Sequence, residues 1–378
     1  MARDYEMPGD IRTWGVYVPQ EAIDNVTEVL KSRWLNTGKW EKSLRQLFCQ
    51  KFGARHTVAV NNGTAALRAS YAMIGIGPGD EVVSTPYTFI ATNTSILEQG
   101  AKPVFADIRY EDLNITAESI EKKITKKTKA IVVVHYAGNP VDLDEIRTLA
   151  SAHNLTVIED SAHALGSKYK GKYIGATGSL VTFSLQVVKI VTCGDGGFIC
   201  TDNEEYYSEL KKLSWYGIDR ENKQTNLFFD PLPDRIDQLG FKYNMNDIVA
   251  ALGIAALNNY DEPAKKRRDI AFRYRQELSH LRKIHLLSYY NDRTPNYQIF
   301  PIHVENRQDF AQYMWDNGIQ IVVNNRRNDR YSIFGGLCSD LKNLEKADND
   351  TILLPIHWDL SDDDLSRIIE KIKLWDKK

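Results

Sequence analysis

Short apolar runs alternate with longer amphipathic segments between residues 55 and 201 of this chain. The runs are rich in β-branched residues, and the amphipathic segments repeat their apolar positions at helical spacing. This pattern is typical of a sheet that is covered by helices on both faces. It predicts helices over residues 64–74 and 90–99, and another that opens at 141–146. Seven strands are predicted in one mixed, mostly parallel sheet, at residues 57–60, 81–84, 103–105, 130–134, 156–159, 180–183 and 197–200.

A second region begins near Pro263. A helix rich in alanine is predicted over residues 246–257, and a long charged helix follows it over residues 264–281. The two helices lie where we expect a hinge between domains. Beyond residue 280 the pattern predicts two strands and a closing helix, at residues 298–302, 318–322 and 361–375.

These elements predict an α/β protein with two domains. Residues 1–260 would form a large domain built on the seven-stranded sheet, and residues 261–378 a smaller C-terminal α+β domain. A chain of 378 residues with 43% hydrophobic content can bury both cores. Neither an internal repeat nor a low-complexity linker is found, so we expect the two parts to pack tightly.

The composition argues against several classes of protein. No apolar run is long enough to cross a bilayer, and residues 1–6 have no apolar core behind them, so neither a membrane span nor a secretory signal is expected. The four cysteines lie far apart without a CxxC pair, which indicates free thiols, no metal site and a cytoplasmic protein. The net charge is −2 with acids and bases intermixed. Therefore no nucleic-acid surface is expected.

Lys189 is the most informative residue, because it follows an apolar stretch and precedes the glycine-rich turn at residues 194–197. A buried ammonium group is costly, and desolvation lowers its pKa toward the neutral amine. Such an amine is a good nucleophile for a Schiff base. The alternative is a lysine that extends from the end of a strand to water.

A phosphate cradle is predicted where an apolar strand leads directly into a helix at residues 61–67. Backbone amides at the start of a helix bind anions, Gly63 allows close approach, and Thr64 adds a hydroxyl. Ser184 offers a second hydroxyl at the end of the strand that leads to Lys189. Taken alone, a Gly-Thr pair in this setting is more often an ordinary helix cap.

An acid and an aromatic ring join Lys189 and the phosphate cradle as candidate site residues. Asp160 ends a predicted buried strand, where an unpaired carboxylate needs a cation, although it could instead cap the next helix. Phe89 follows another strand in a turn with Tyr87, and either ring could stack on a flat heteroaromatic ligand or belong to the core. A nucleophilic amine, a phosphate cradle, an acid for a ring nitrogen and a ring face are what pyridoxal 5′-phosphate requires.

The chain resembles the DegT/DnrJ/EryC1/StrS family, the sugar aminotransferases of fold type I, from about residue 12 to 375. The resemblance is carried by four blocks of sequence that are weak alone and specific together. They are residues 62–67 (Asn-Gly-Thr-Ala-Ala-Leu), 159–163 (Glu-Asp-Ser-Ala-His), 183–197 (Phe-Ser to Lys189 and the Gly-Asp-Gly-Gly turn) and 240–246 (Gly-Phe-Lys-Tyr-Asn-Met-Asn).

The resemblance implies a role for each matching residue. Lys189 would form the Schiff base with pyridoxal phosphate and shuttle the proton, and the cofactor would pass through pyridoxamine phosphate during turnover. Asp160 would pair with the pyridine nitrogen, His163 would approach the ring hydroxyl and Phe89 would stack on the ring. The cofactor phosphate would be held by Gly63, Thr64 and Ser184.

The resemblance also implies a homodimer with shared active sites, because Asn244 would reach the phosphate from the partner subunit. Asn36 and Thr37 lie in a segment that resembles the substrate-facing N-terminal loop of the family. The chain departs from the family between Ser184 and Lys189, where Leu-Gln-Val-Val replaces aromatic and small polar residues. This departure concerns the substrate pocket rather than the chemistry.

A second departure lies at residues 324–331, where three arginines stand in a loop that is more aromatic in many relatives. Arginine forks suit phosphate or carboxylate. Arg326 and Arg327 are therefore candidates to bind a nucleotide-sugar diphosphate or the acid group of another keto sugar. The alternative is a solvated basic loop.

The function implied is transfer of an amino group, with L-glutamate as donor, to a keto sugar, foremost a nucleotide-linked keto-deoxy sugar. The product would be an amino sugar for polysaccharide, glycan or other amino-sugar biosynthesis. The alternatives are an aminotransferase for a free acidic keto sugar, a sugar dehydratase that uses pyridoxamine phosphate, another pyridoxal enzyme such as a lyase, and a regulator that senses a ligand without catalysis. Those dehydratases have a histidine in place of the lysine, so Lys189 favours transfer.

Overall fold

The fold is that of a computed structural model, in which residues 11–219, 235–323 and 325–378 are described. The residues 1–6 considered for a secretory signal, and Asn324 of the arginine-containing loop, lie outside the described residues. Within the described part, no helix is both long enough and apolar enough to span a membrane.

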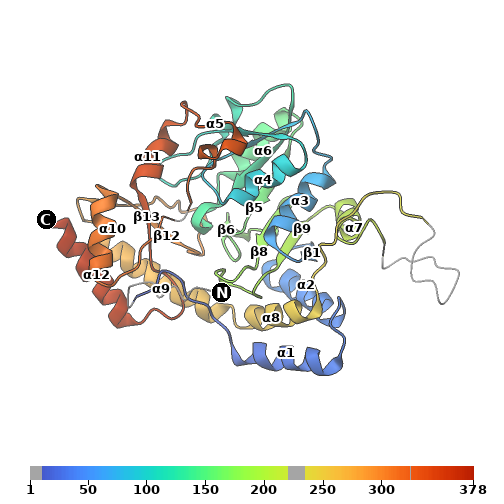
Figure 1. The fold of residues 1–378 in the computed structure, drawn as a ribbon, viewed down its shortest axis with the longest axis horizontal. Helices are drawn as coiled ribbons and strands as arrows, with labels where there is room; N and C mark the ends of the chain where they lie inside the picture. Colours follow the sequence, from blue (N-terminus) through green and yellow to red (C-terminus); the bar gives the residue numbers. More distant parts are fainter. Residues whose placement is uncertain (1–10, 220–234, 324) are drawn as a thin grey trace.

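A seven-stranded mixed sheet forms the centre of the fold, as predicted (Figure 1). Its strand order is β1-β9-β8-β5-β4-β2-β3, and β9 runs antiparallel to both of its neighbours while the remaining pairs are parallel. The buried apolar runs explain these strands, since both faces of the sheet are covered. The strands are β1 (His56–Val60), β2 (Glu81–Ser84), β3 (Lys102–Phe105), β4 (Thr128–Val134), β5 (Thr156–Asp160), β8 (Val181–Ser184) and β9 (Gly197–Thr201).

Helices cover both faces of this sheet. On one face, α3 (Gly63–Met73), α4 (Ile90–Glu98) and α7 (Glu204–Leu213) pack on alternate residues such as Val132 and Ile158. On the other face, the intervening residues such as Val133 contact a second set of helices. That set contains α2 (Lys39–Phe52), α5 (Ala117–Glu121), α6 (Leu143–Ala152) and α8 (Asp247–Asn258), and α1 (Gln20–Ser32) packs against α8.

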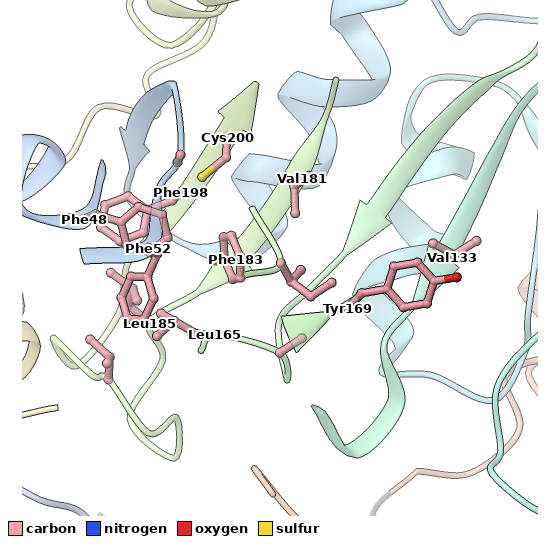
Figure 2. Packing of buried hydrophobic residues seen from close by; sticks show 14 of the residues in the cluster. Phe48, Phe52, Val133, Leu165, Tyr169, Val181, Phe183, Leu185, Phe198 and Cys200 are labelled. Carbon is pink, nitrogen blue, oxygen red and sulfur yellow. The ribbon is translucent and has the colours of Figure 1, made fainter. Parts of the chain in front are cut away.

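An aromatic cluster fixes α2 against strands β8 and β9 (Figure 2). The ring of Phe48 lies 4.6 Å from that of Phe198 and 5.5 Å from that of Phe183, measured between centroids. Because side chains alternate along a strand, Phe183 turns to this core while Ser184 faces α3. The cluster therefore anchors the strand whose end carries Ser184 toward the helix that begins at Gly63.

A smaller antiparallel sheet lies in the C-terminal part, with the order β10-β12-β13. It is formed by β10 (Ile284–Leu286), β12 (Phe300–Val304) and β13 (Thr351–Leu354). The strand predicted at residues 318–322 is wrong, because this segment makes single bridges through Ile319 and Val322. The helices here are α9 (Asp261–Leu278), α10 (Arg307–Asp316), α11 (Lys342–Asp350) and α12 (Asp362–Asp376), and a third small sheet joins β6 (Lys168–Tyr169), β7 (Lys172–Tyr173) and β11 (Arg293–Thr294).

Helix α9 connects the two cores. It starts at Asp261, ahead of the predicted start, because Pro263 is tolerated in the first turn of a helix. Ala264 belongs to the core of the large sheet, whereas Ile270 and the residues after it belong to the C-terminal core. Ile11 also packs in the C-terminal core. We therefore propose that the two domains meet at residues 260/261, where α9 begins, and that both domains share this helix. Ile11 packs with the smaller domain.

Candidate active site

The carboxyl ends of β1, β2, β4, β5 and β8 open into one cavity of ≈ 690 Å³. These strands all point the same way, so the residues that follow them gather at one edge of the sheet, which is where ligands bind in such folds. The cavity is lined by six of the residues singled out from the sequence and by Lys189 itself. The six are Gly63, Thr64, Phe89, Asp160, His163 and Ser184.

Helix α3 presents its amino terminus to the cavity. Asn62 caps it, and the Asn62 side chain accepts a hydrogen bond of 2.7 Å from the amide of Ala65. A Cβ atom added at Gly63 would stand 2.8 Å from Cβ of Ser184, so the helix start and the end of β8 approach as closely as glycine allows. The amides at the helix start, the Thr64 hydroxyl and the Ser184 hydroxyl therefore surround one small space suited to an anion.

Asp160 ends β5 and is 5% exposed. Its Oδ2 atom accepts a hydrogen bond of 2.6 Å from the hydroxyl of Thr92, and its Oδ1 atom accepts one of 3.1 Å from the amide of Ala162. The Thr92 hydroxyl lies in turn 2.9 Å from that of Thr88. Both donors bind the carboxyl oxygens of Asp160 and so fix the orientation of its side chain at the cavity.

Lys189 lies in the loop after β8, beside the same cavity. Desolvation lowers the pKa of its ammonium group to about 8; the Asp160 carboxylate opposes this shift and the Arg267 cation adds to it. A substantial fraction of Lys189 is consequently the neutral amine near pH 8. The sequence-based expectation of a nucleophilic lysine thus has a physical cause in its surroundings.

We expect this amine to show its pKa directly in the protein without ligand. Acylation of Lys189 by a small excess of acetic anhydride should rise with pH and reach half its maximum near pH 8, because only the deprotonated amine reacts. The measurement is the mass of the peptide that contains Lys189 after brief labelling at each pH. A half-maximum at the ordinary lysine value of 10.5 would contradict this environment.

His163 is a neutral histidine at the cavity wall. Burial, followed by the nearby charge of Lys189, keeps its pKa well below the ordinary value of 6.5. Its Nδ1 atom is buried without a hydrogen-bond partner among the described residues. A buried polar atom of this kind is costly unless a ligand satisfies it.

Phe89 precedes α4 and is 64% exposed although it lines the cavity. By contrast, Tyr87 in the same turn is buried in a cluster with Tyr136. The structure therefore distinguishes the two aromatics that the sequence left open. The Phe89 ring is the one available to a ligand.

Three predicted residues lie away from this cavity, in a second hollow or its rim. Asn244 donates a hydrogen bond of 2.7 Å to the hydroxyl of Thr37, and both residues line a separate hollow of ≈ 270 Å³. Asn36 is exposed next to them, and its carbonyl accepts from the amide of Asp247. Within one chain, then, the structure does not bring these residues to Lys189.

The arginine loop departs from expectation. Arg327 is buried, and its guanidinium forms a two-point ion pair with Asp329 at 2.7 and 2.6 Å and also donates to the carbonyl of Cys338. Two of the guanidinium nitrogens expected to bind substrate thus hold the loop instead, and we propose a structural role for Arg327. Arg326 is exposed and does not line the cavity of Lys189 in this chain.

The same loop contributes a residue that the sequence did not single out. Asn325 is 6% exposed and lines the cavity, and its Nδ2 atom has no hydrogen-bond partner among the described residues. Asn328 joins the loop to the large domain. Its side chain donates a hydrogen bond of 2.9 Å to the carbonyl of Thr88 and accepts one of 2.8 Å from the side chain of Asn93. Trp14 and Gln298 also line the cavity. Only the unusual polarity of the loop at residues 324–331 signalled Asn325.

Comparison with known proteins agrees with this geometry. The sequence model of the DegT/DnrJ/EryC1/StrS aminotransferase family matches residues 17–373. The chain belongs to this family. Its members transfer amino groups, so the protein is an aminotransferase, and its site is that of an enzyme.

Individual relatives span this aminotransferase almost from end to end. An uncharacterised protein of Methanocaldococcus jannaschii, MJ1066, is 35% identical over 94% of this chain and 95% of its own. The sugar aminotransferase CalS13 of Micromonospora echinospora is 30% identical, with a TM-score of 0.90 over 96% of this chain and 99% of that chain. Spr1654 of Streptococcus pneumoniae, in its PLP form, is 29% identical, with a TM-score of 0.88 over 97% of this chain and 98% of that chain.

Proposed function

We propose that this aminotransferase uses pyridoxal 5′-phosphate to convert a keto sugar into an amino sugar, with L-glutamate as the amino donor. The acceptor we propose is a nucleotide-linked keto-deoxy sugar, and the product an intermediate for polysaccharide, glycan or other amino-sugar synthesis. One observation carries the proposal: a lysine with a lowered pKa and a hydrogen-bonded carboxyl group share one cavity with the amino terminus of α3.

The residues present fit this cofactor. Its phosphate suits the start of α3 beside Ser184, where the close contact of Gly63 with Ser184 leaves no room for a methyl group in place of the glycine hydrogen. Asp160 would pair with the protonated pyridine nitrogen. The unpartnered Nδ1 atom of His163 would meet the ring hydroxyl, and the exposed ring of Phe89 would cover one face. Thr64 would add its hydroxyl to the phosphate.

When bound, the cofactor supplies an electron sink for the carbanion that forms next to the amino group. In the resting enzyme, Nζ of Lys189 would hold the cofactor covalently. As a free amine, the same atom would remove the α proton of the donor and return a proton in the second half-reaction. Asp160 would pair with the pyridine nitrogen, and the hydroxyl of Thr92 and the amide of Ala162 would keep its side chain in place.

We propose that the enzyme works as a homodimer with shared sites. The support is that Asn244, which the family pattern assigns to the phosphate, lies outside the cavity of its own chain. A second copy would supply it. Asn36 and Thr37, at the same hollow, would contribute to the sugar site in the same way, and we retain Arg326 as a candidate for the charged part of the acceptor.

The cytoplasm is the compartment that we propose for this reaction. All four cysteines are free thiols, as a reducing environment requires. Burial raises the pKa of the Cys193 and Cys200 thiols, so neither is a reactive thiolate near the site.

Absorption spectroscopy followed by mass analysis tests the function. Purified protein with pyridoxal phosphate should show the absorbance of the lysine-bound cofactor, and L-glutamate should convert it to the pyridoxamine form. A panel of keto sugar nucleotides and one free acidic keto sugar then identifies the acceptor by the mass of the amino product. Failure to bind the cofactor would favour a regulator. Loss of water from the sugar would indicate a dehydratase, and turnover without an acceptor would indicate a lyase.

Replacing Gly63 tests the phosphate site separately. We expect Gly63→Ala to weaken pyridoxal phosphate binding on the order of tenfold, because the new methyl group must push α3 away from Ser184. Binding is measured by titrating absorbance at equilibrium. Gly77→Ala is the matched control, since nothing lies within 4 Å of its added Cβ atom. Equal affinities in the two variants would argue against this site.

A further inference from the structure

The peptide groups on both sides of Lys189 are bound by one buried side chain from the C-terminal part of the fold. Oε1 of Gln298 accepts a hydrogen bond of 3.0 Å from the amide of Ile190. Nε2 of the same side chain donates one of 2.8 Å to the carbonyl of Val188. Gln298 is 1% exposed, so the two contacts are shielded from water. The amide group of Gln298 thus brackets Lys189.

Gln298 is itself firmly held. The backbone amide of Gln298 donates a hydrogen bond of 2.9 Å to Oδ1 of Asn296, and Nδ2 of Asn296 donates one of 2.8 Å to the carbonyl of Leu165. The backbone carbonyl of Gln298 accepts a hydrogen bond of 2.8 Å from the guanidinium of Arg267 on α9. The same guanidinium donates one of 2.8 Å to the carbonyl of Ile356. The bracket is therefore fixed at its base by a buried arginine and on its flank by an asparagine.

The loop that contains Lys189 is held by few contacts of its own, so the bonds from Gln298 add to its support. The amide of Lys189 donates 2.8 Å to the carbonyl of Gln186, and that of Cys193 donates 3.1 Å to Leu185. These bonds close local turns, but they do not join the loop to the rest of the site. The two bonds of Gln298 make that connection, across the boundary between the two proposed domains.

We propose that Gln298 is a positioning residue for Lys189: it fixes the Val188–Ile190 backbone so that the lysine side chain stays desolvated in the cavity and aligned with Asp160. The inference rests on the proposed function for the role of Lys189, but the placement itself is a property of the protein without cofactor. The hydrogen bonds of the Gln298 side chain go to the backbone of Val188 and Ile190, so Gln298 acts on Lys189 through the peptide backbone.

The charged surroundings of Lys189 come from several elements. Asp160 ends β5, His163 follows it, Asp195 lies in the glycine-rich turn, Arg68 lies on α3, and Arg267 lies on α9. Tyr136, which follows β4, lines the same cavity. Gln298→Met replaces none of these side chains, and it keeps the backbone carbonyl of residue 298 to which Arg267 donates. A shift in the pKa of Lys189 would therefore report its displacement among them.

The test is the pH at which labelling of Lys189 by acetic anhydride is half-maximal, in cofactor-free protein. Gln298→Met keeps the length of the side chain and removes both hydrogen bonds. We expect its half-maximum to move up by about one pH unit or more from the wild-type value, toward that of a solvated lysine. With cofactor and glutamate, kcat should fall while KM for glutamate changes little, because alignment and not donor binding is lost.

Gln320→Met is the matched control. Gln320 is also buried, and its Oε1 atom accepts 2.9 Å from the amide of Thr13, far along the chain from Lys189. Both variants should lose thermal stability, but only Gln298→Met should move the labelling midpoint. If Gln298→Met does not fold, Gln298→Asn serves, since its shorter side chain cannot reach both peptides.

The outcomes separate the two proposals. Equal labelling midpoints in the wild type and in both methionine variants would overturn the positioning role. A shifted midpoint in a protein that binds no pyridoxal phosphate would uphold the positioning role and reject the proposed function. A shifted midpoint with a fall in kcat supports both.

Discussion

Lys189→Ala should yield a folded protein that has lost turnover by at least about 10⁴-fold. The reason is that Lys189 has two roles in the proposed reaction, covalent attachment of the cofactor and transfer of the proton. The side chain also lies in a cavity rather than in the core, so its loss should leave the sheet and both hydrophobic cores intact. Removing a desolvated cation should even relieve a cost to the fold.

The measurement combines steady-state transamination with the absorbance of the lysine-bound cofactor. That absorbance should be missing in Lys189→Ala, and circular dichroism should remain that of the wild type. Lys265→Ala is a suitable control, because Lys265 is an exposed lysine paired with Asp269 on α9. A Lys189→Ala enzyme with near-normal turnover would exclude the assignment of this lysine.

Asp160→Asn should lower turnover by about 10³-fold and weaken cofactor binding at the same time. The hydroxyl of Thr92 and the amide of Ala162 both donate to this side chain, so an amide nitrogen in its place would face a donor. The variant also removes the negative charge that would keep the pyridine nitrogen protonated. Both binding and the stabilisation of carbanion charge should therefore suffer.

Glu159→Gln gives the comparison for this variant. Glu159 is the neighbouring acid on β5, but it binds His135 at 3.1 Å and Arg147 at 2.7 Å, away from the cavity. We expect this control to reduce thermal stability and leave the affinity for pyridoxal phosphate unchanged, as read from equilibrium titration. If Asp160→Asn behaved like Glu159→Gln, Asp160 would have no special relation to the cofactor.

The sequence predicts the central sheet well for a simple physical reason. A strand that is covered on both faces must be apolar at nearly every position, as in β4 (Thr128–Val134), and such runs are visible without knowledge of contacts. The residues that end these strands could be placed together because parallel strands share an edge. Gly63, Asp160 and Ser184 are indicated in this way, whereas Lys189 is indicated by its place between an apolar stretch and the glycine-rich turn.

The smaller domain was predicted less well. Residues 318–322 have the composition of a strand, but the paired strand is β13 at residues 351–354, and 318–322 only bridges to residues 11 and 353. Which apolar run pairs with β12 depends on long-range packing. The loop at residues 324–331 shows the same limit. Its composition does not predict that Asp329 forms an ion pair with the guanidinium of Arg327, or that Asn325 lines the cavity. Nor does the sequence around Gln298 predict that its side chain binds the backbone of Val188 and Ile190.

The register of β5 has a consequence for how faithfully the chain must fold. Five consecutive pairs join β5 to β4, from Ala130 with Thr156 to Val134 with Asp160. Because neighbouring residues of a strand face opposite sides, a slip by one position could bring Glu159 to the place of Asp160, and Ile158 would then take the place of Glu159. His135 and Arg147 would face an apolar side chain instead of the carboxylate that they bind. The pairing of β5 with β4 therefore decides which of two adjacent acids reaches the cavity, and the contacts of Glu159 oppose the wrong register.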